Sequence, residues 1–395
     1  MRVDLFSREY PPEVYGGAGV HVEYLARELR HLLDVRVHCF GAPRSEAGVQ
    51  AYDVPSELAD ANAALGVLGV DLQMAAGAAG ADLVHSHTWY ANMAGHTAKL
   101  LHGMPHVMTT HSLEPLRPWK AEQLGGGYAL SSWAERTAVE AADAVIAVSA
   151  GMRADVLRCY PNVNPAKVSV IHNGIDTDQY APDPGTDLML RHQVDPERPT
   201  VVFVGRITRQ KGLPYLLHAA QSFDSDAQIV LCAGAPDTKE ILTEVTDLVN
   251  ILRAERDGVI WISESLPRPD VVQILSHATV FVCPSVYEPM GIVNLEAMAC
   301  ETAVVATATG GIPEVVADGE TGLLVAIDQL DDGTGIPRDP DGFATDFAAA
   351  VNTVLRDPSR AAAMGKAGRE RAVTQFSWPE IASRTAQLYA SLAQR

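Results

Sequence analysis

Short apolar runs alternate with longer amphipathic stretches along the first half of the chain. Runs rich in β-branched residues occupy positions 35–40, 83–85, 106–110 and 144–148, and the intervals between them are mostly long enough for a helix. This alternation predicts parallel strands joined by crossover helices. We therefore expect a Rossmann-like, doubly wound α/β domain over residues 1–179.

The same pattern restarts after residues 180–185, a Pro- and Asp-containing stretch that we interpret as a linker. The apolar runs of this second set are residues 200–204, 228–232, 259–262, 280–283 and 303–306. They predict a second Rossmann-like domain over residues 187–375. The last segment, residues 376–395, has helical spacing, and we expect it to cross back onto the first domain. A chain of 395 residues exceeds what one core usually organises, so we expect two domains that face a central cleft.

Charge and composition exclude several classes of partner. The formal net charge is −19, which would repel nucleic acid and anionic lipid at long range. The Ala- and Gly-rich stretch over residues 59–84 is interrupted by Asp60, Asp71 and Asp82, which a bilayer-spanning helix would not tolerate well. We expect neither a nucleic acid nor a membrane as partner, and a second copy of the chain stays open.

The cysteines and the N-terminus bear on location. The five cysteines are odd in number, widely spaced and mostly set in apolar runs, as small buried residues are in a reducing compartment. The N-terminus carries no basic stretch followed by an apolar export block. Both features favour the cytoplasm.

The loop from Gly205 to Gly212 follows a predicted strand and precedes a predicted helix that begins at Leu213. Ligands of parallel sheets bind at the carboxyl ends of strands, where free N–H groups at a helix start favour phosphate. Arg206 and Lys211 add positive charge there, which stabilises a departing diphosphate and replaces a divalent metal. The alternative is a solvated basic turn.

The segment from Glu288 to Glu296 contains two carboxylates eight residues apart, after the run over residues 280–283. With Glu288 in a loop and Glu296 about two turns into a helix, the two would contact different parts of an elongated ligand. Glu288 suits hexose hydroxyls, and Glu296 suits ribose hydroxyls. The alternative for Glu288 is a favourable acidic first turn of a helix.

Two further motifs are weaker. Three glycines within residues 16–19, in the segment that joins a first strand around residues 3–6 to a helix, indicate close backbone approach, but the dinucleotide-binding spacing is absent. His85 and His87 lie on one face of an extended segment, yet no Cys, Asp or Glu at ligand spacing accompanies them, so we favour a strand end over a zinc site. His111 follows a strand in the first domain and can brace a sugar.

These motifs together resemble the family 4 glycosyltransferases of GT-B fold, and within them the actinobacterial glycogen synthase-like or maltose-1-phosphate synthase-like enzymes. The likeness covers nearly the whole chain and is densest in residues 8–21, 85–90, 110–120, 205–212 and 285–296. It implies transfer of glucose from ADP-glucose with retention of the anomeric configuration, without a cofactor or metal. The implied acceptor is α-glucose 1-phosphate, giving maltose 1-phosphate for glycogen synthesis, or the end of an α-1,4-glucan.

The sequence departs from larger bacterial glycogen synthases at two positions. Those enzymes carry Lys-x-Gly-Gly-Leu where this chain has residues 14–18, Val-Tyr-Gly-Gly-Ala, and an Asp where this chain has Thr88. The departures favour glucose 1-phosphate as the acceptor over polymer extension. A phosphorylated acceptor needs cations of its own, and we predict that Arg117 and Lys120 near His111 supply them. The alternative is a surface loop whose charges are solvated.

The resemblance assigns roles residue by residue. The catalytic residues it implies are Glu288, His111, Arg206 and Lys211. The donor-binding residues are Gly16, Gly17, Gly205, Arg206, Lys211, Pro289, Met290, Gly291 and Glu296. To these we add, as our own prediction, the acceptor-binding residues Tyr15, Thr88, Trp89, Arg117, Lys120 and Tyr128.

Three competing functions fit the same fold. A lipid-linked mannosyltransferase would need a basic, aromatic surface, against which the charge and the 6% aromatic content argue. A nucleotide-sugar epimerase would need an acid and a base around the sugar C2. A regulatory module that only binds nucleotides would have no need of Arg206, Lys211, Glu288 and His111 together.

Overall fold

The computed structural model describes residues 1–14 and 16–393, apart from the side chains of Glu122 and Gln123. The chain forms two compact units: unit 1 is Met1–Gly174 with the segment that begins at Trp378, and unit 2 is Ile175–Ser377. Residues 180–185, which we interpreted as a linker, belong to unit 2. The Asp183 N–H donates to Ser276 Oγ at 3.0 Å, and this bond connects the stretch to α10 (Arg268–Ser276) of unit 2.

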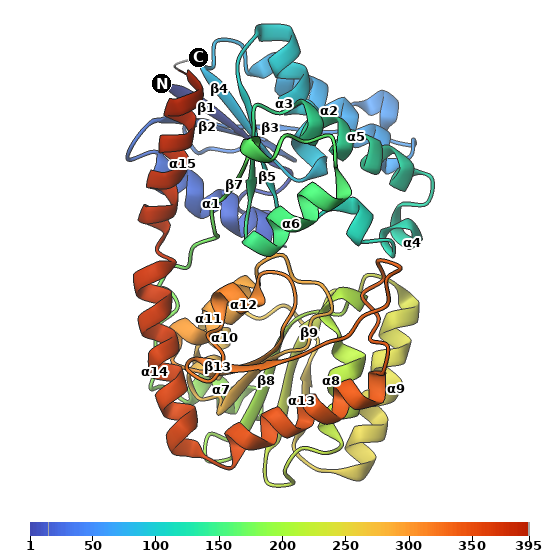
Figure 1. The fold of residues 1–395 in the computed structure, drawn as a ribbon, viewed down its shortest axis with the longest axis vertical. Coiled ribbons are helices and arrows are strands. Elements are labelled where there is room, and N and C mark those ends of the chain that lie inside the picture. Colours follow the sequence, from blue (N-terminus) through green and yellow to red (C-terminus); the bar gives the residue numbers. More distant parts are fainter. Residues whose placement is uncertain (15, 394–395) are drawn as a thin grey trace. The chain divides into compact units, whose positions relative to one another are not determined.

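Unit 1 is built on a sheet of seven parallel strands in the order β3-β2-β1-β4-β5-β6-β7. The strands are β1 (Arg2–Phe6), β2 (Asp34–Phe40), β3 (Val49–Tyr52), β4 (Leu83–His87), β5 (His106–Thr110), β6 (Ala144–Ala147) and β7 (Val168–Val170). In the register, Leu5 of β1 pairs with Val37 of β2 on one side and with His85 of β4 on the other. The strand order reverses between β1 and β4 (Figure 1).

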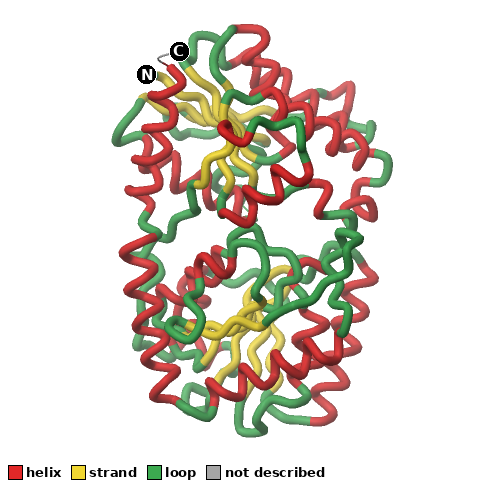
Figure 2. The backbone as a smooth tube through the Cα atoms, in the orientation of Figure 1, coloured by secondary structure: helices red, strands yellow, loops and turns green. Residues whose placement is uncertain are grey.

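Helices lie on both faces of this sheet (Figure 2). They are α1 (Gly17–Leu29), α2 (Ala63–Gly77), α3 (Trp89–His102), α4 (Lys120–Leu124), α5 (Gly127–Ala141), α6 (Ala150–Cys159) and α15 (Trp378–Ala393). Alternation along β1 divides the core: Val3 and Leu5 pack with residues of α1 and α15, and Phe6 packs with residues of α2 and α3. One buried strand therefore supports two helical layers.

Unit 2 repeats the plan with six parallel strands in the order β10-β9-β8-β11-β12-β13. They are β8 (Thr200–Arg206), β9 (Gln228–Gly234), β10 (Val259–Ile262), β11 (Val280–Cys283), β12 (Ala303–Thr307) and β13 (Gly322–Val325). The helices are α7 (Asp187–Arg191), α8 (Leu213–Ala220), α9 (Lys239–Glu255), α10 (Arg268–Ser276), α11 (Ile292–Ala299), α12 (Ile312–Val315), α13 (Pro340–Leu355) and α14 (Pro358–Gln375). Val201 and Phe203 pack with residues of α8, α9 and α13 to form the core on one face.

The two doubly wound sheets confirm the predicted fold class. Three strands had no clear signal in the sequence: β3, β7 and β13, each of which lies at the edge of its sheet. They are only three or four residues long, and half or more of each is not fully buried. Edge strands of this kind lack the continuous apolar run that marks a central parallel strand.

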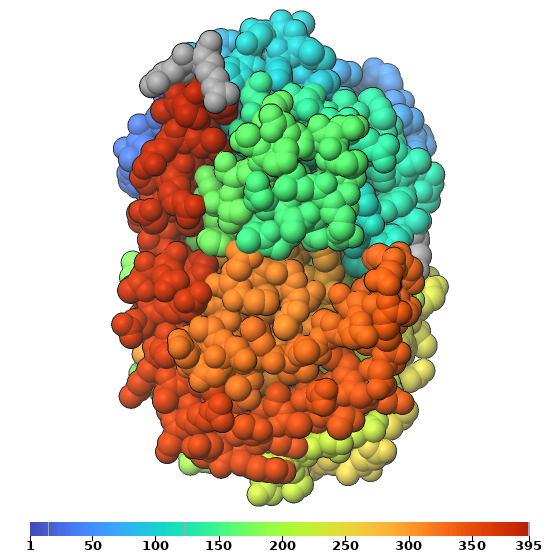
Figure 3. Space-filling view, viewed as in Figure 1, coloured from blue at the N-terminus to red at the C-terminus, as the bar shows by residue number. Residues whose placement is uncertain are grey.

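The last helix, α15, completes the core of unit 1 and lies at the surface of the molecule (Figure 3). The Trp378 ring stacks on Tyr24 of α1, with ring centroids 5.6 Å apart. The fully buried Tyr389 hydroxyl lies 2.6 Å from His85 Nδ1, and the other ring nitrogen of His85 lies 2.7 Å from Thr109 Oγ1. The expected return of this segment to unit 1 thus places a polar link inside the core. Within the described residues, no helix combines the length and the apolar character needed to cross a membrane.

We expect Tyr389→Phe to lower the free energy of unfolding of unit 1 by about 1–3 kcal/mol, because it leaves a buried nitrogen of His85 without a partner. Urea denaturation followed by tryptophan fluorescence measures this, since four of the five tryptophans lie in unit 1 and only Trp261 lies in unit 2. Tyr215→Phe is the matched control, because the half-buried Tyr215 hydroxyl has no hydrogen-bond partner among the described residues. Equal stability of the two variants would contradict the role given to Tyr389.

Candidate active site

The predicted donor loops meet at the point where the strand order of unit 2 reverses. Strands β8 and β11 are neighbours, and the chain leaves β8 toward β9 on the other side. The loop over residues 205–212 follows β8, and the loop over residues 284–291 follows β11. Crevices at the carboxyl ends of such strands bind ligands in open α/β sheets.

Backbone contacts lock these two loops together. The Val286 N–H donates to the Gln210 carbonyl at 2.9 Å. Gly212 has a φ of +64°, and a Cβ atom there would lie 2.0 Å from the Pro284 carbonyl oxygen. Only glycine satisfies both the left-handed conformation and the close approach. The loop therefore has a fixed shape before any ligand binds.

Lys211 and Glu288 form an ion pair across these loops, with Lys211 Nζ 2.6 Å from Glu288 Oε2. The Glu288 side chain is 9% exposed and the Lys211 side chain 22%. Ser285 Oγ donates to the same carboxylate oxygen at 3.1 Å. Burial is the largest single influence and lowers the pKa of Lys211, but the charges of Glu288 and Cys283 and the hydrogen bond to Glu288 together hold that pKa above its usual value. Lys211 therefore stays charged at neutral pH.

Arg206, the second predicted cation, ends strand β8 and lies 3.2 Å from Asp237 Oδ1 through its Nη1 atom. Its side chain is 40% exposed. Gly205 precedes it in the strand. Both cations thus lie in the segment over residues 205–212. The Arg206 side chain is partly exposed to solvent, and Lys211 is held by Glu288.

The loop after β12 supports the backbone of Glu288. The Gly311 N–H donates to the Glu288 carbonyl at 2.9 Å, and Gly310, with a φ of +55°, lies so close that a Cβ atom would meet the same oxygen at 1.9 Å. Helix α11 begins only at Ile292. The interpretation of Glu288 as an acidic first-turn residue is therefore wrong, because the residue lies in the preceding loop.

Glu296 lies one turn into α11, not about two turns as we expected, because the helix begins later. Its side chain is hydrogen-bonded to Tyr180, and burial raises its pKa. Pro289, Met290 and Gly291 are buried in the same loop. Asn294, which the sequence did not single out, is fully buried, and both polar atoms of its amide lack a partner in the described structure. Buried amide groups are nearly always hydrogen-bonded, so Asn294 is an added candidate for contact with a ligand at this loop.

In unit 1, the glycine-rich segment forms the start of α1. Gly16 is the N-cap and Gly17 the first residue of the helix. The Gly16 N–H donates to Glu9 Oε2 at 2.8 Å. A carboxylate of the chain therefore already occupies part of this helix start, a contact between residues seven positions apart that sequence reasoning missed.

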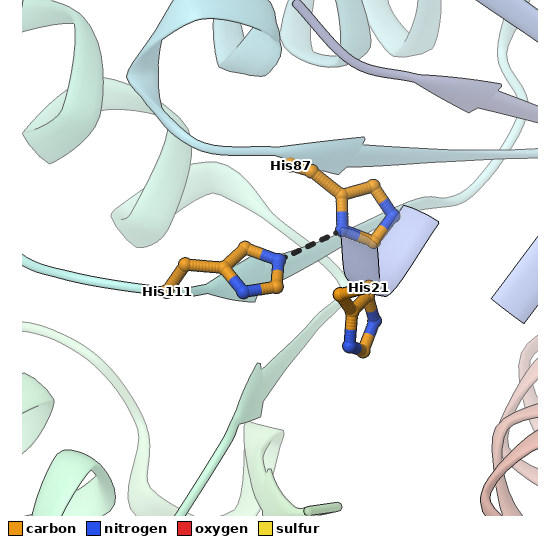
Figure 4. A group of neighbouring side chains, drawn as sticks. All are labelled: His21, His87 and His111. Atoms are coloured by element: carbon orange, nitrogen blue, oxygen red, sulfur yellow. Dashed lines mark hydrogen bonds between the residues drawn. The ribbon is translucent and has the colours of Figure 1, made fainter. Parts of the chain in front are cut away.

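Three histidines converge in unit 1 (Figure 4). His87 ends β4, His111 follows β5, and His21 comes from α1. His87 Nδ1 lies 3.1 Å from His111 Nε2, and the His21 ring centroid lies 4.7 Å from that of His111. Sequence reasoning considered His85 with His87 and missed His21, since neighbouring elements and not spacing bring the three together. Burial lowers the pKa of all three, that of His21 to about 4, so the rings are neutral at pH 7.

The predicted acceptor residues differ in accessibility. Arg117 is half-buried and donates to Ser112 Oγ at 2.8 Å, while its Nε atom is buried without a partner in the described residues. Lys120 is half-buried at the start of α4. The Tyr128 hydroxyl donates to the Glu114 carbonyl at 2.7 Å. Arg117 is thus the one of these three with an unused buried donor.

The remaining acceptor residues lie around the end of β4. Thr88 has a φ of +64°, which is strained for a β-branched residue and typical of functional sites. Trp89 is 3% exposed and packs with Ala64 and Val67 in a core cluster, so its side chain anchors the start of α3 in the core. Tyr15 lies outside the described residues.

Comparison with known proteins identifies the family. The family model described as Glycosyltransferase Family 4 matches residues 15–179, and the one described as Glycosyl transferases group 1 matches residues 187–371. The alpha-maltose-1-phosphate synthase of Mycolicibacterium smegmatis is 59% identical over 392 residues, which cover 98% of this chain and 99% of that protein. The enzyme of the same name from Mycobacterium tuberculosis is 56% identical over the same shares.

The solved structures agree in fold. Sucrose-phosphate synthase from Thermosynechococcus elongatus superposes with a TM-score of 0.79 at 25% identity, covering 99% of this chain and 98% of its own. The resemblance seen in the sequence is thereby confirmed. The chain belongs to the family 4 glycosyltransferases, and it is a nucleotide-sugar-dependent hexosyltransferase of GT-B fold.

Proposed function

We propose that this enzyme transfers glucose from ADP-glucose to α-glucose 1-phosphate and forms α-maltose 1-phosphate, a unit for α-1,4-glucan synthesis. The observation that carries the proposal is the identity of 56–59%, over nearly the full length, to two enzymes named alpha-maltose-1-phosphate synthase. The departures from the glycogen synthase motifs at residues 14–18 and at Thr88 support the small acceptor over a glucan.

The donor is assigned to the locked loops of unit 2. Arg206 and Lys211 bind the diphosphate, and Lys211 stays charged because Glu288 pairs with it. Preorganised cations stabilise charge that develops on the leaving group without any reorganisation. We therefore assign no metal to the reaction. Glu296 accepts from the ribose hydroxyls, and Glu288 with the backbone around Gly291 binds the hexose.

We propose a front-side mechanism with retention of configuration. The bond between the glucose C1 and the β-phosphate oxygen breaks, and the acceptor O4 forms its bond to C1 on the same face. The O4 proton passes to the leaving phosphate oxygen, so ADP departs with it. Two features support this sequence. The Glu288 carboxylate is paired with Lys211 and is a poor nucleophile, and His111 is neutral, which suits a hydrogen-bond donor to the hexose.

The acceptor phosphate is assigned to Arg117 with Lys120. The unpartnered buried Nε of Arg117 supports this assignment, because a buried donor without a partner is costly until an acceptor binds. The cytoplasmic location stays a prediction, which the five free cysteines, four of them buried, support.

A product assay tests the reaction itself. We expect ADP-glucose with α-glucose 1-phosphate to yield a phosphorylated disaccharide in the presence of EDTA, and faster than glycogen is elongated in parallel. Anion-exchange chromatography with mass spectrometry measures both products. Preferential labelling of glycogen would instead make the enzyme a glucan-extending synthase.

Lys211→Met should lower kcat/KM for ADP-glucose by about 10²- to 10³-fold, the usual effect of removing one preorganised charge at a transition state. Steady-state kinetics at saturating glucose 1-phosphate measures the change. Lys239→Met, at an exposed lysine that begins α9, serves as control and should leave the rate unchanged. A Lys211 variant with wild-type kinetics would remove the diphosphate site from this loop.

Arg117→Ala should raise KM for glucose 1-phosphate by roughly 10- to 100-fold, which corresponds to a lost charged hydrogen bond of about 1.5–3 kcal/mol. The KM for ADP-glucose should stay within about twofold. Arg136→Ala, at an exposed arginine of α5, is the matched control. Unchanged use of glucose 1-phosphate by the Arg117 variant would refute the assignment.

A further inference from the structure

The three histidines of unit 1 form a cluster that the proposed reaction does not fully use. One ring nitrogen from each of His21, His87 and His111 lies within 4.8 Å of the others. The three rings come from α1, from the end of β4 and from the loop after β5 (Figure 4). The ends of β4 and β5 and the helix α1 fix the positions of these rings.

Two of these rings carry buried nitrogens without a partner. His21 Nδ1 lies 2.7 Å from Asn173 Oδ1, which is an acceptor, so this nitrogen carries the proton. His21 Nε2 therefore presents a lone pair, and it has no partner in the described structure. His87 Nε2 is also buried and unpartnered there, while the nitrogen of His87 that faces His111 is Nδ1. A histidine whose far nitrogen donates to an oxygen while the near one is free is the arrangement found at metal ligands.

The spacing of the closer pair suits one bound ion. Two nitrogens bound to tetrahedral Zn²⁺ at about 2.0–2.1 Å lie about 3.3 Å apart. His87 Nδ1 and His111 Nε2 are 3.1 Å apart, so an ion can replace the shared proton with little movement. The His21 ring centroid lies 4.7 Å from that of His111 and 5.3 Å from that of His87, and its ligand nitrogen lies within 4.8 Å of theirs, so His21 supplies the third ligand.

His85 is excluded as a ligand although its ring lies 4.2 Å from that of His87. Both of its nitrogens are engaged, one with Tyr389 and one with Thr109. His85 packs against the His87 ring and borders the cluster without being a ligand.

We propose that His21, His87 and His111 form a binding site for a transition-metal ion of the Zn²⁺ class, and that an ion bound there inhibits the transferase. Three imidazoles without a carboxylate select Zn²⁺, Co²⁺, Ni²⁺ or Cu²⁺ over Mg²⁺ and Ca²⁺. The inhibition rests on the proposed function, which assigns His111 to the donor hexose. An ion held by His111 Nε2 fixes that ring and places a positive charge beside the assigned hexose position.

Metal binding is measured first, without substrates and on the full chain. Chelator-treated protein is titrated with ZnCl₂ by calorimetry at pH 7.5, and with CoCl₂ while visible absorption reports tetrahedral coordination. We expect one tight site per chain and intense Co²⁺ bands. His21→Gln and His87→Gln should each weaken Zn²⁺ binding by about 10- to 100-fold or more. The control is His31→Gln, at an exposed histidine, which should bind as the wild type does.

The melting temperature of each variant without metal separates the two causes of lost binding. A variant that melts as the wild type does has lost ligands and not its fold. Absence of Zn²⁺ binding to the wild type, or equal binding by the wild type and both variants, overturns the site. Activity is measured separately: Zn²⁺ should inhibit the wild type reversibly with EDTA. Zn²⁺ binding at the histidines without inhibition would overturn the proposed inhibition and leave the metal site standing. A failed product assay with intact Zn²⁺ binding refutes the proposed function and leaves the site standing.

Discussion

Lys211 and Glu288 form a partly buried ion pair at the ends of β8 and β11, and the donor loops are organised around it. A buried charge that loses its partner is strongly destabilising, so neither residue is free to move away from the other. Gly212 and Gly310 allow the backbones around the pair to approach closely, which side chains of other residues would prevent. The pair therefore sets both the charge and the shape of this region before a ligand arrives.

The order of the parallel strands decides where such a pair can form. In each unit the chain first winds in one direction and then returns to the other side of its first strand. Loops that leave the sheet in opposite directions separate at that point and leave room for a ligand. In unit 2 these are the loops after β8 and β11, and in unit 1 they are the loop before α1 and the end of β4 with His87 and Thr88.

The sequence predicted the parts of this structure that depend on local pattern. The central strands have continuous apolar runs, and the loop from Gly205 to Gly212 has a recognisable position between a strand and a helix. Contacts between distant segments were beyond its reach. No sequence pattern near His21 predicts that Asn173 orients its ring. Likewise, no pattern predicts that the Glu9 carboxylate accepts from the Gly16 N–H. The depth of Glu296 in its helix was misjudged, because α11 begins only at Ile292, after Gly291 with a φ of +86°.

The return of α15 to unit 1 has a consequence for the order in which the protein can be made. Tyr389 and Trp378 belong to the core that is otherwise built from residues 1–174, and they are translated after all of unit 2. Domains generally fold as they leave the ribosome, beginning with the N-terminal one. Here unit 1 leaves the ribosome before α15 can cover its core. Until then His85 lacks its hydrogen bond to the Tyr389 hydroxyl. All of unit 2 leaves the ribosome before that helix arrives, so the unit begun first is the one finished last.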